Sequence, residues 1–273
     1  MRIFSLVSGS SGNSYLFLNR REAVLIDAGL SLRSLKMKLA ELGLQDISIL
    51  GIFISHEHSD HVKGLEAIAN HFKASIFITN GTKGALESKM RHPEKQKWRI
   101  IAAQSEIDLA GFAVKAVAIS HDATEPVAFT VSCGGLKVAV VSDTGVITPE
   151  WEILADTEKF DIFFLEANYD QEMLLGGSYS YPLKMRIMSD RGHLSNSQTA
   201  EFLYRLYNNG CCNFVLTHLS LNNNFPELAM LVVRSYFAQA GINVGDQVEV
   251  FCAPRYDTME YKINEKGKLC FED

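Results

Sequence analysis

The chain has 273 residues, 47% of them hydrophobic, which is enough to bury a large core in one α/β domain. Its formal net charge of −6 predicts solubility and gives no support for broad, sequence-blind binding of nucleic acid, although a local basic patch is compatible with it. No run of about 18 apolar residues is present, and the five cysteines are odd in number and scattered. We therefore expect a cytoplasmic protein with reduced thiols, no disulfide framework and no membrane contact.

Short apolar segments predict strands, and amphipathic segments between them predict helices. The first strands are expected at 2–8, 14–18 and 23–28, and the first helix at 31–43, with Ser31 as its N-cap and Gly43 at its end. Further strands are expected at 49–54, 75–79, 113–119, 137–142, 161–165 and 213–217, and within 248–263 near the end. Further helices are expected at 62–72, 80–90, 197–208 and 226–240. This order predicts sheets covered by helices.

Six of the expected strands run into a side chain that can bind a metal or transfer a proton. These side chains are Asp27, His56, His121, Asp143, Glu166 and His218. Ligands of open α/β sheets lie at the carboxyl ends of strands, so the six could converge on one site. One strand continues directly into the segment HEHSDH, which also holds His58, Asp60 and His61. A single polar strand ending is more often structural, but six endings together with this loop predict a functional site.

Imidazole and carboxylate groups suit Zn, Mn, Fe or Co, and no cysteine lies among the candidates. Seven candidate ligands are too many for one tetrahedral zinc site and suit two metals that share a carboxylate and a bridging water. They are His56, His58, Asp60, His61, His121, Asp143 and His218. Two metals about 3.5–4 Å apart activate a water for hydrolysis. We expect two divalent metal ions, Zn or Mn, with Fe as a further option.

Asp27, the motif SHEHSDH, His121, the motif SDTG and His218 occur in the order of the five motifs of the metallo-β-lactamase fold superfamily. The chain resembles this family over nearly its whole length. The resemblance implies an αββα sandwich, in which two mixed sheets are covered by helices, as a single domain spanning 1–273. It places one metal on His56, His58 and His121 and the other on Asp60, His61 and His218, with Asp143 bridging. Asp27 would orient the histidine loop, Asp60 would also take part in catalysis, and Glu57 would not be a ligand.

A second group of residues narrows the chemistry. Glu166 in FLEANYD and His193 in RGHLSN resemble the glutamate–histidine pair of phosphodiesterases such as ribonuclease Z. In that family the histidine binds phosphate and protonates the leaving oxygen, a step that an alkoxide leaving group requires. The start of the following helix can bind an anion. The candidate phosphate-binding residues there are Ser195, Asn196 and Arg191, with Lys184 and Arg186 nearby.

The closer resemblance is to the YycJ (WalJ) group of cytoplasmic bacterial 5′-to-3′ DNA exonucleases. It is carried by SGSSGNS, LIDAG, SHEHSDHVKGL, SHDATEP, SDTG, RIMSDRGHLSN and THLSLNNN. His193 follows Asp143 by only 50 positions, so we expect no β-CASP insertion. Two positions depart from the group's pattern and concern substrate contacts: Tyr169 stands where a histidine is expected, and Leu175 stands near an expected basic residue.

These features predict a metal-dependent phosphodiester hydrolase with a dinuclear metal-activated water, best matched by a 5′-to-3′ DNA exonuclease whose partner is DNA. A hydrolase of small (cyclic) phosphodiesters is the alternative, and the acidic net charge fits it. A lactonase or thioesterase has less need of Glu166 and His193. A non-catalytic metal-binding or regulatory protein would be expected to have lost ligands, and none is missing. The sequence indicates no protein partner.

Overall fold

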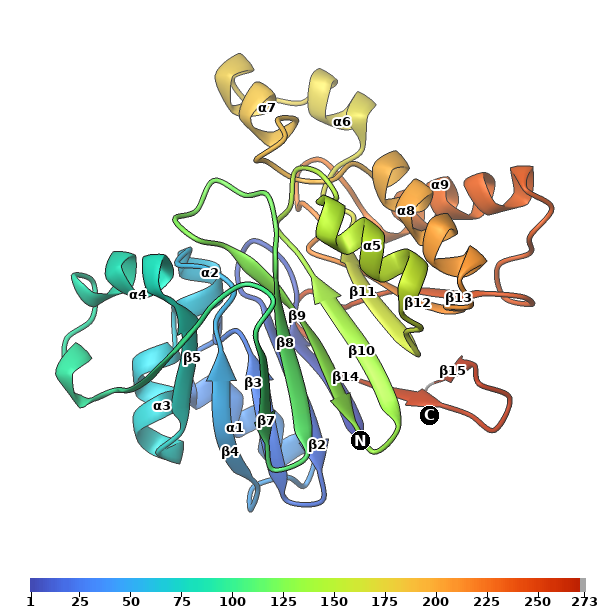
Figure 1. The fold of residues 1–273 in the computed structure, drawn as a ribbon. Helices are drawn as coiled ribbons and strands as arrows, with labels where there is room; N and C mark the ends of the chain where they lie inside the picture. The colour runs from blue at the N-terminus through green and yellow to red at the C-terminus, as the bar shows by residue number, and fades with distance from the viewer. Residues whose placement is uncertain (271–273) are drawn as a thin grey trace. The chain divides into compact units, whose positions relative to one another are not determined.

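The structure, a computed structural model, describes residues 1–270 and consists of two compact units. The first unit comprises residues 1–118, 123–135 and 254–262. The second comprises 119–122, 136–253 and the described residues from 263 onward. Figure 1 labels most of the helices and strands of both. The expectation of a single domain over 1–273 stays a prediction.

The first unit contains a mixed sheet with the strand order β14-β1-β2-β3-β4-β5-β6. Neighbouring strands are antiparallel from β14 to β3 and parallel from β3 to β6. The parallel half brings the carboxyl ends of β3 and β4 to the same edge. The strands are β1 (Arg2–Val7), β2 (Ser14–Asn19), β3 (Glu22–Ile26), β4 (Ser48–Phe53), β5 (Ser75–Thr79), β6 (Lys97–Ile101) and β14 (Met259–Ile263).

The two faces of this sheet are covered differently. Ile52 of β4 belongs to one apolar core with residues of α1 (Leu32–Glu41) and α3 (Leu65–Phe72). The next residue, Phe53, points the other way, because side chains alternate along a strand, and its ring lies 5.8 Å from that of Phe129. Phe129 belongs to an antiparallel meander of β7 (Glu106–Leu109), β8 (Phe112–Ala118) and β9 (Val127–Cys133). The shorter helices are α2 (Ser59–Val62), α4 (Asn80–Glu87) and the 3-10 helix η1 (Pro93–Lys95).

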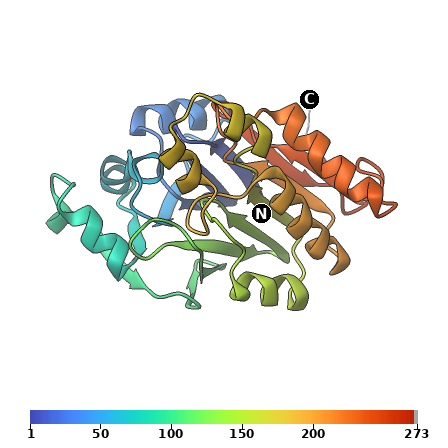
Figure 2. The same cartoon turned by 90° about the horizontal axis from the view of Figure 1, so that it is seen from above.

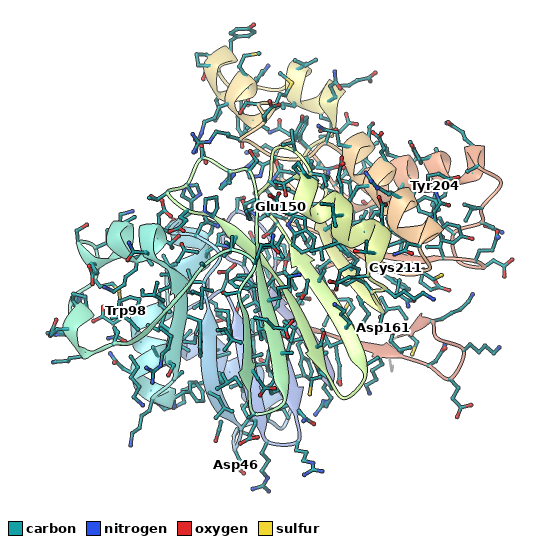
Figure 3. All side chains as sticks on the ribbon, viewed as in Figure 1. Asp46, Trp98, Glu150, Asp161, Tyr204 and Cys211 are labelled. Carbon is teal, nitrogen blue, oxygen red and sulfur yellow. The ribbon has the colours of Figure 1, made fainter. Side chains whose placement is uncertain are left out.

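The second unit is built on four parallel strands in the order β13-β12-β11-β10. Helices α8 and α9 lie side by side (Figure 1, Figure 2). Tyr204 of α8, labelled in Figure 3, contacts Phe237 of α9, whose ring lies 6.2 Å from Phe214 of β12. The elements are β10 (Leu136–Val141), α5 (Pro149–Thr157), β11 (Ile162–Glu166), α6 (Gln171–Gly176), α7 (Tyr181–Ile187), α8 (Asn196–Asn208), β12 (Asn213–Thr217), α9 (Pro226–Gln239), β13 (Glu249–Cys252) and β15 (Leu269–Cys270).

All strands and helices expected from the sequence are present, and most of their bounds agree within one to three residues. The helix expected at 62–72 differs, because α3 begins only at Leu65 and the short α2 precedes it. Strands β6, β7 and β9 and helices α5, α6 and α7 were not expected. Within residues 1–270, no helix has both the length and the apolar character that crossing a membrane requires.

Candidate metal centre and catalytic pair

The histidine-rich loop after β4 is held by two neighbouring loops of the first unit. Asn13 donates its backbone N–H to the Asp60 carbonyl at 2.7 Å, and Ala28 donates to the His61 carbonyl at 2.7 Å. Gly29 lies so close that a Cβ there would stand 1.7 Å from the Asp60 carbonyl oxygen. Only glycine at position 29 therefore allows the three loops to pack in this way.

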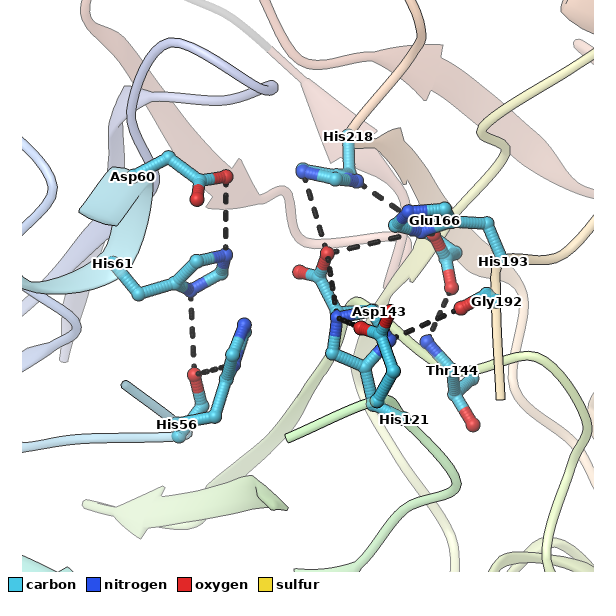
Figure 4. Close-up of polar contacts among 12 residues, drawn as sticks. His56, Asp60, His61, His121, Asp143, Thr144, Glu166, Gly192, His193 and His218 are labelled. Carbon is cyan, nitrogen blue, oxygen red and sulfur yellow. Dashed lines mark hydrogen bonds and ion pairs between the residues drawn. The ribbon is translucent and has the colours of Figure 1, made fainter. Parts of the chain in front are cut away.

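The four candidate ligands of this loop come together. The ring centroid of His56 is 4.6 Å from that of His58 and 4.1 Å from that of His61. Oδ2 of Asp60 is 3.5 Å from Nε2 of His61, and Figure 4 shows these two side chains pointing toward each other. His56 and His61 are fully buried. Buried imidazoles beside a carboxylate are suitable ligands for a divalent cation.

Asp27 connects this cluster to the sheet. Its carboxylate accepts hydrogen bonds from the backbone N–H and the hydroxyl of Ser55, both at 2.8 Å, and lies 2.7 Å from Nδ1 of His61. A carboxylate at Nδ1 keeps the imidazole proton on that atom, which leaves the Nε2 lone pair for a cation. This is the geometry that the expected orienting role of Asp27 requires.

The second unit brings its own three candidate ligands together. Oδ1 of Asp143 is 3.5 Å from Nε2 of His218 and 3.9 Å from Nε2 of His121. Nδ1 of His121 lies 3.1 Å from the Gly192 carbonyl, so its Nε2 is the atom turned toward Asp143 (Figure 4). Burial lowers the pKa of His121 and thereby favours the neutral imidazole that metal binding needs.

Three of the strand-end residues have a left-handed backbone. The φ angles are +58° at Asp27, +58° at Asp143 and +51° at His218. Asp and His adopt this region more readily than most residues, yet each such residue still costs about 1–3 kcal/mol. The neighbouring contacts must therefore hold these side chains in position.

Glu166 and His193 form the expected pair in the second unit. Glu166 ends β11 fully buried; its Oε2 lies 3.0 Å from Nδ1 of His193, and its Oε1 accepts from the Thr144 backbone N–H. Burial acts to raise the pKa of Glu166, but the imidazoles of His193 and His218 outweigh it, and the pKa lies below its ordinary value. His193 is 19% exposed and its Nδ1 is 3.7 Å from Oδ1 of Asp143. A partly exposed imidazole oriented by a buried carboxylate can serve as a general acid.

The candidate phosphate-binding residues have contacts within the chain. The Ser195 hydroxyl accepts from the Gln198 N–H as the N-cap of α8. Asn196 is buried and bonded to Asn224, and Arg191 donates from Nε to the His121 carbonyl at 3.1 Å. Their part in binding phosphate stays a prediction.

The two departures from the expected pattern lie in different surroundings. Tyr169 is buried, and burial raises the pKa of its hydroxyl. Leu175, on α6, is 50% exposed. A basic side chain at position 175 would therefore reach solvent, whereas a substitution at 169 would meet packed neighbours.

Three site residues escaped the sequence analysis. Nδ2 of Asn13 lies 3.0 Å from Nε2 of His61. The Ser55 hydroxyl donates a hydrogen bond to Oδ2 of Asp27. Nδ2 of Asn168 lies 3.1 Å from Nδ1 of His218. Asn13 belongs to the motif SGSSGNS. Its place in a motif that carried the resemblance was the one signal for it.

The donor sets of both units fit divalent transition metals. Each set combines imidazoles with a carboxylate and contains no thiolate, as Zn, Mn and Fe accept. The Nδ1 atoms of His61 and His121 are engaged by Asp27 and the Gly192 carbonyl, as expected of metal-binding histidines. Asp143, His193 and His218 also offer ligand atoms within 4.8 Å of one another, so His193 lies beside two of the candidate ligands.

Residues 22–219 match the family described as "Beta-lactamase superfamily domain". The exodeoxyribonuclease WalJ of Streptococcus pneumoniae is 34% identical over 253 residues, which cover 90% of this chain and 91% of the relative. The exodeoxyribonuclease YycJ of Bacillus anthracis is 33% identical over 248 residues, covering 90% and 92%. The metallo-β-lactamase fold protein YhfI from Bacillus subtilis superposes with a TM-score of 0.69 at 14% identity, covering 95% of this chain and 100% of that one.

The chain therefore belongs to the β-lactamase superfamily and, within it, to the group that includes these two exodeoxyribonucleases. The resemblance to this superfamily and to the YycJ (WalJ) group is confirmed. The expected fold class is confirmed as well: an α/β fold of the metallo-β-lactamase kind, with two mixed sheets and flanking helices.

Proposed function

We propose that this chain is a metal-dependent exodeoxyribonuclease that hydrolyses DNA from its 5′ end. Similarity over 90% of the chain to two proteins named exodeoxyribonucleases supports DNA as the substrate. The observation that carries the chemistry is the 3.0 Å contact between buried Glu166 and partly exposed His193. A sugar oxygen leaves as an alkoxide and needs a proton, which this pair is built to deliver.

We further propose that the ligands of both units form one centre for two divalent cations, Zn or Mn, with Fe as an alternative. One cation would be held by His56, His58 and His121, the other by Asp60, His61 and His218, and Asp143 would be shared. Family membership and the donor chemistry support this assignment. Bound in this way, the two cations supply an activated water and offset the charge that develops on the phosphate.

The remaining steps belong to the chain's own residues. Glu166 holds the His193 ring through Nδ1, so Nε2 is the atom that passes the proton to the leaving oxygen. Asp60, whose side chain is 19% exposed, accepts a hydrogen bond from the attacking water. Asp27 holds His61 in the orientation that binding requires. We place the reaction in the cytoplasm, because Cys133, Cys211, Cys212 and Cys252 are thiols without disulfide partners.

The test uses single- and double-stranded DNA labelled at the 5′ or the 3′ end, with Mn or Zn. The expected result is early release of labelled mononucleotide from 5′-labelled strands only, and loss of this activity after chelation. His58→Ala should lower both the metal content and the rate. If DNA stays intact while a cyclic or aryl phosphodiester is hydrolysed quickly, the chain is a hydrolase of small phosphodiesters, which its net charge of −6 also fits.

A further inference from the structure

The first unit contains a groove of about 660 Å³ that is lined by residues of α2 and α3 on one side and by the end of α4 and the segment after it on the other. Its volume is typical of ligand-binding sites. Three cationic side chains, Lys63, Lys89 and Arg91, line it together with apolar residues such as Leu65 and Met90. The groove therefore combines positive charge with an apolar floor.

The three cations are exposed, and within residues 1–270 none of them forms an ion pair. Two basic residues close to His193 in the sequence are engaged within the chain. Lys184 donates to the Leu175 and Gly177 carbonyls at 2.7 Å, and Arg186 pairs with Asp122. In a chain with a net charge of −6, three cations without acidic partners in one groove favour an anionic occupant.

Two carboxylates also line the groove, and both are bound within the chain. Glu57 accepts from the backbone N–H and the hydroxyl of Thr124 at 2.8 and 2.6 Å. Glu66 accepts from the backbone N–H groups of Arg91 and His92 at 3.1 and 2.8 Å. These bonds offset part of the negative charge, and those of Glu66 hold the backbone that carries Arg91 against α3.

The groove begins at the histidine loop, because Glu57 and Ser59, the two neighbours of His58, belong to its lining. We propose that this groove binds the phosphodiester backbone of the DNA strand next to the phosphate being hydrolysed. Lys63, Lys89 and Arg91 would each contact a phosphate, while the apolar floor accommodates sugars and bases. The inference rests on the proposed function, because it assigns this groove as the path that the DNA substrate follows away from the metal centre.

The size of the effect follows from counterion release. Each phosphate contact with a single strand contributes about 0.7 to the slope of log K against log salt concentration. Removing three contacts should therefore lower the slope by about 2. A slope difference of about 2 means that the affinity changes by about 100-fold for each tenfold change in salt concentration. Taking equal affinities of wild type and variant at 1 M salt, the variant should bind about 100-fold more weakly at 0.1 M salt.

The experiment compares the metal-loaded wild type with two triple variants of equal charge. The groove variant is Lys63→Gln, Lys89→Gln, Arg91→Gln. The control variant is Arg33→Gln, Lys36→Gln, Arg99→Gln, three exposed cations outside the groove lining. Fluorescence anisotropy gives the affinity for a labelled 20-nucleotide single strand at several salt concentrations. Kinetics give the ratio of kcat/KM for that strand to kcat/KM for a dinucleotide, which has no second phosphodiester to fill the groove.

The expected result is a smaller salt slope and a lower ratio for the groove variant, with much smaller changes for the control. Equal slopes and ratios in the two variants would refute the groove while leaving DNA hydrolysis by the wild type intact. A wild type that degrades neither DNA substrate would refute the proposed function itself, and the groove assignment with it.

Discussion

Replacing His193 with alanine should slow DNA hydrolysis by about 10²–10⁴-fold, the usual contribution of a general acid. At 1.36 kcal/mol per factor of ten, this is about 3–5 kcal/mol of transition-state stabilisation. The side chain is 19% exposed and lies outside the apolar core, so its removal should leave the fold and the metal content unchanged. Circular dichroism and elemental analysis check both.

The leaving group separates a proton donor from a structural residue. A p-nitrophenolate departs without protonation, so hydrolysis of bis-p-nitrophenyl phosphate by the His193→Ala variant should fall far less than hydrolysis of DNA. The matched control is His71→Ala, which removes an exposed imidazole on α3 and should change neither rate. Equal, slight losses on both substrates with His193→Ala would refute the assignment of His193 as the acid.

Glu166→Gln should give an intermediate loss. The two carboxylate oxygens accept from Thr144 N–H and face His193 Nδ1, and an amide can replace only one of these acceptors. A hydrogen bond to a charged group contributes about 1.5–3 kcal/mol, which corresponds to a rate loss of about 10–150-fold. A loss as large as that of His193→Ala would mean that Glu166 does more than orient the ring.

Three further predictions concern stability and thiol chemistry. Asp27→Ala leaves the buried donors of Ser55 and His61 without their acceptor and should lower the free energy of unfolding by about 2–4 kcal/mol; urea unfolding with an unchanged midpoint would contradict this. The added Cβ of Gly29→Ala meets the Asp60 carbonyl, and this variant should lower the free energy of unfolding by about 3 kcal/mol or more. In α4, the Cβ of Gly84→Ala meets nothing within 4 Å, and this variant should raise the free energy of unfolding by about 0.5–1 kcal/mol. Urea unfolding of the two variants tests this order of stability. Burial raises the pKa of Cys211 and Cys252 to about 12, so at pH 8 about one thiol in 10⁴ is ionised. Alkylation of these two thiols in the native chain should therefore be very slow. Mass spectrometry measures alkylation before and after unfolding in guanidinium, and equal alkylation rates in the two states would disprove the prediction.

Most strands of the two sheets could be predicted from sequence because buried strands such as β4 and β12 are short apolar runs that stop at a polar residue. Strand β6 was missed because Lys97 and Arg99 leave it half exposed, so its pattern carries little apolar signal. Helix α7 was missed for a similar reason: it has no buried residue, and its place depends on tertiary contacts such as the hydrogen bond from Lys184 to the Leu175 carbonyl of α6. Helix α5 had usable signals, Thr148 as N-cap and Pro149 at the first turn, that were not exploited.

The candidate ligands could be found because they follow strands, and strand ends have a sequence pattern. Asn13 and Asn168 could not, because an amide in a turn acquires its role only when distant loops meet. Asn13 reaches His61 across 48 positions and Asn168 reaches His218 across 50. Such a contact leaves no periodic pattern of apolar residues in the local sequence. A single sequence therefore cannot distinguish these two asparagines from ordinary turn residues.

The left-handed backbone at Asp27, Asp143 and His218 also restricts which substitutions the chain tolerates. At an ordinary strand end a β-branched residue is acceptable, but at these three positions it would clash with its own backbone before any question of activity arises. In a saturation library selected for folding alone, glycine and asparagine should persist at position 143, while valine, isoleucine and threonine should disappear. These positions are thus constrained twice. Backbone geometry first limits which residue types can fold there, and the chemistry of the side chain then selects among those residue types.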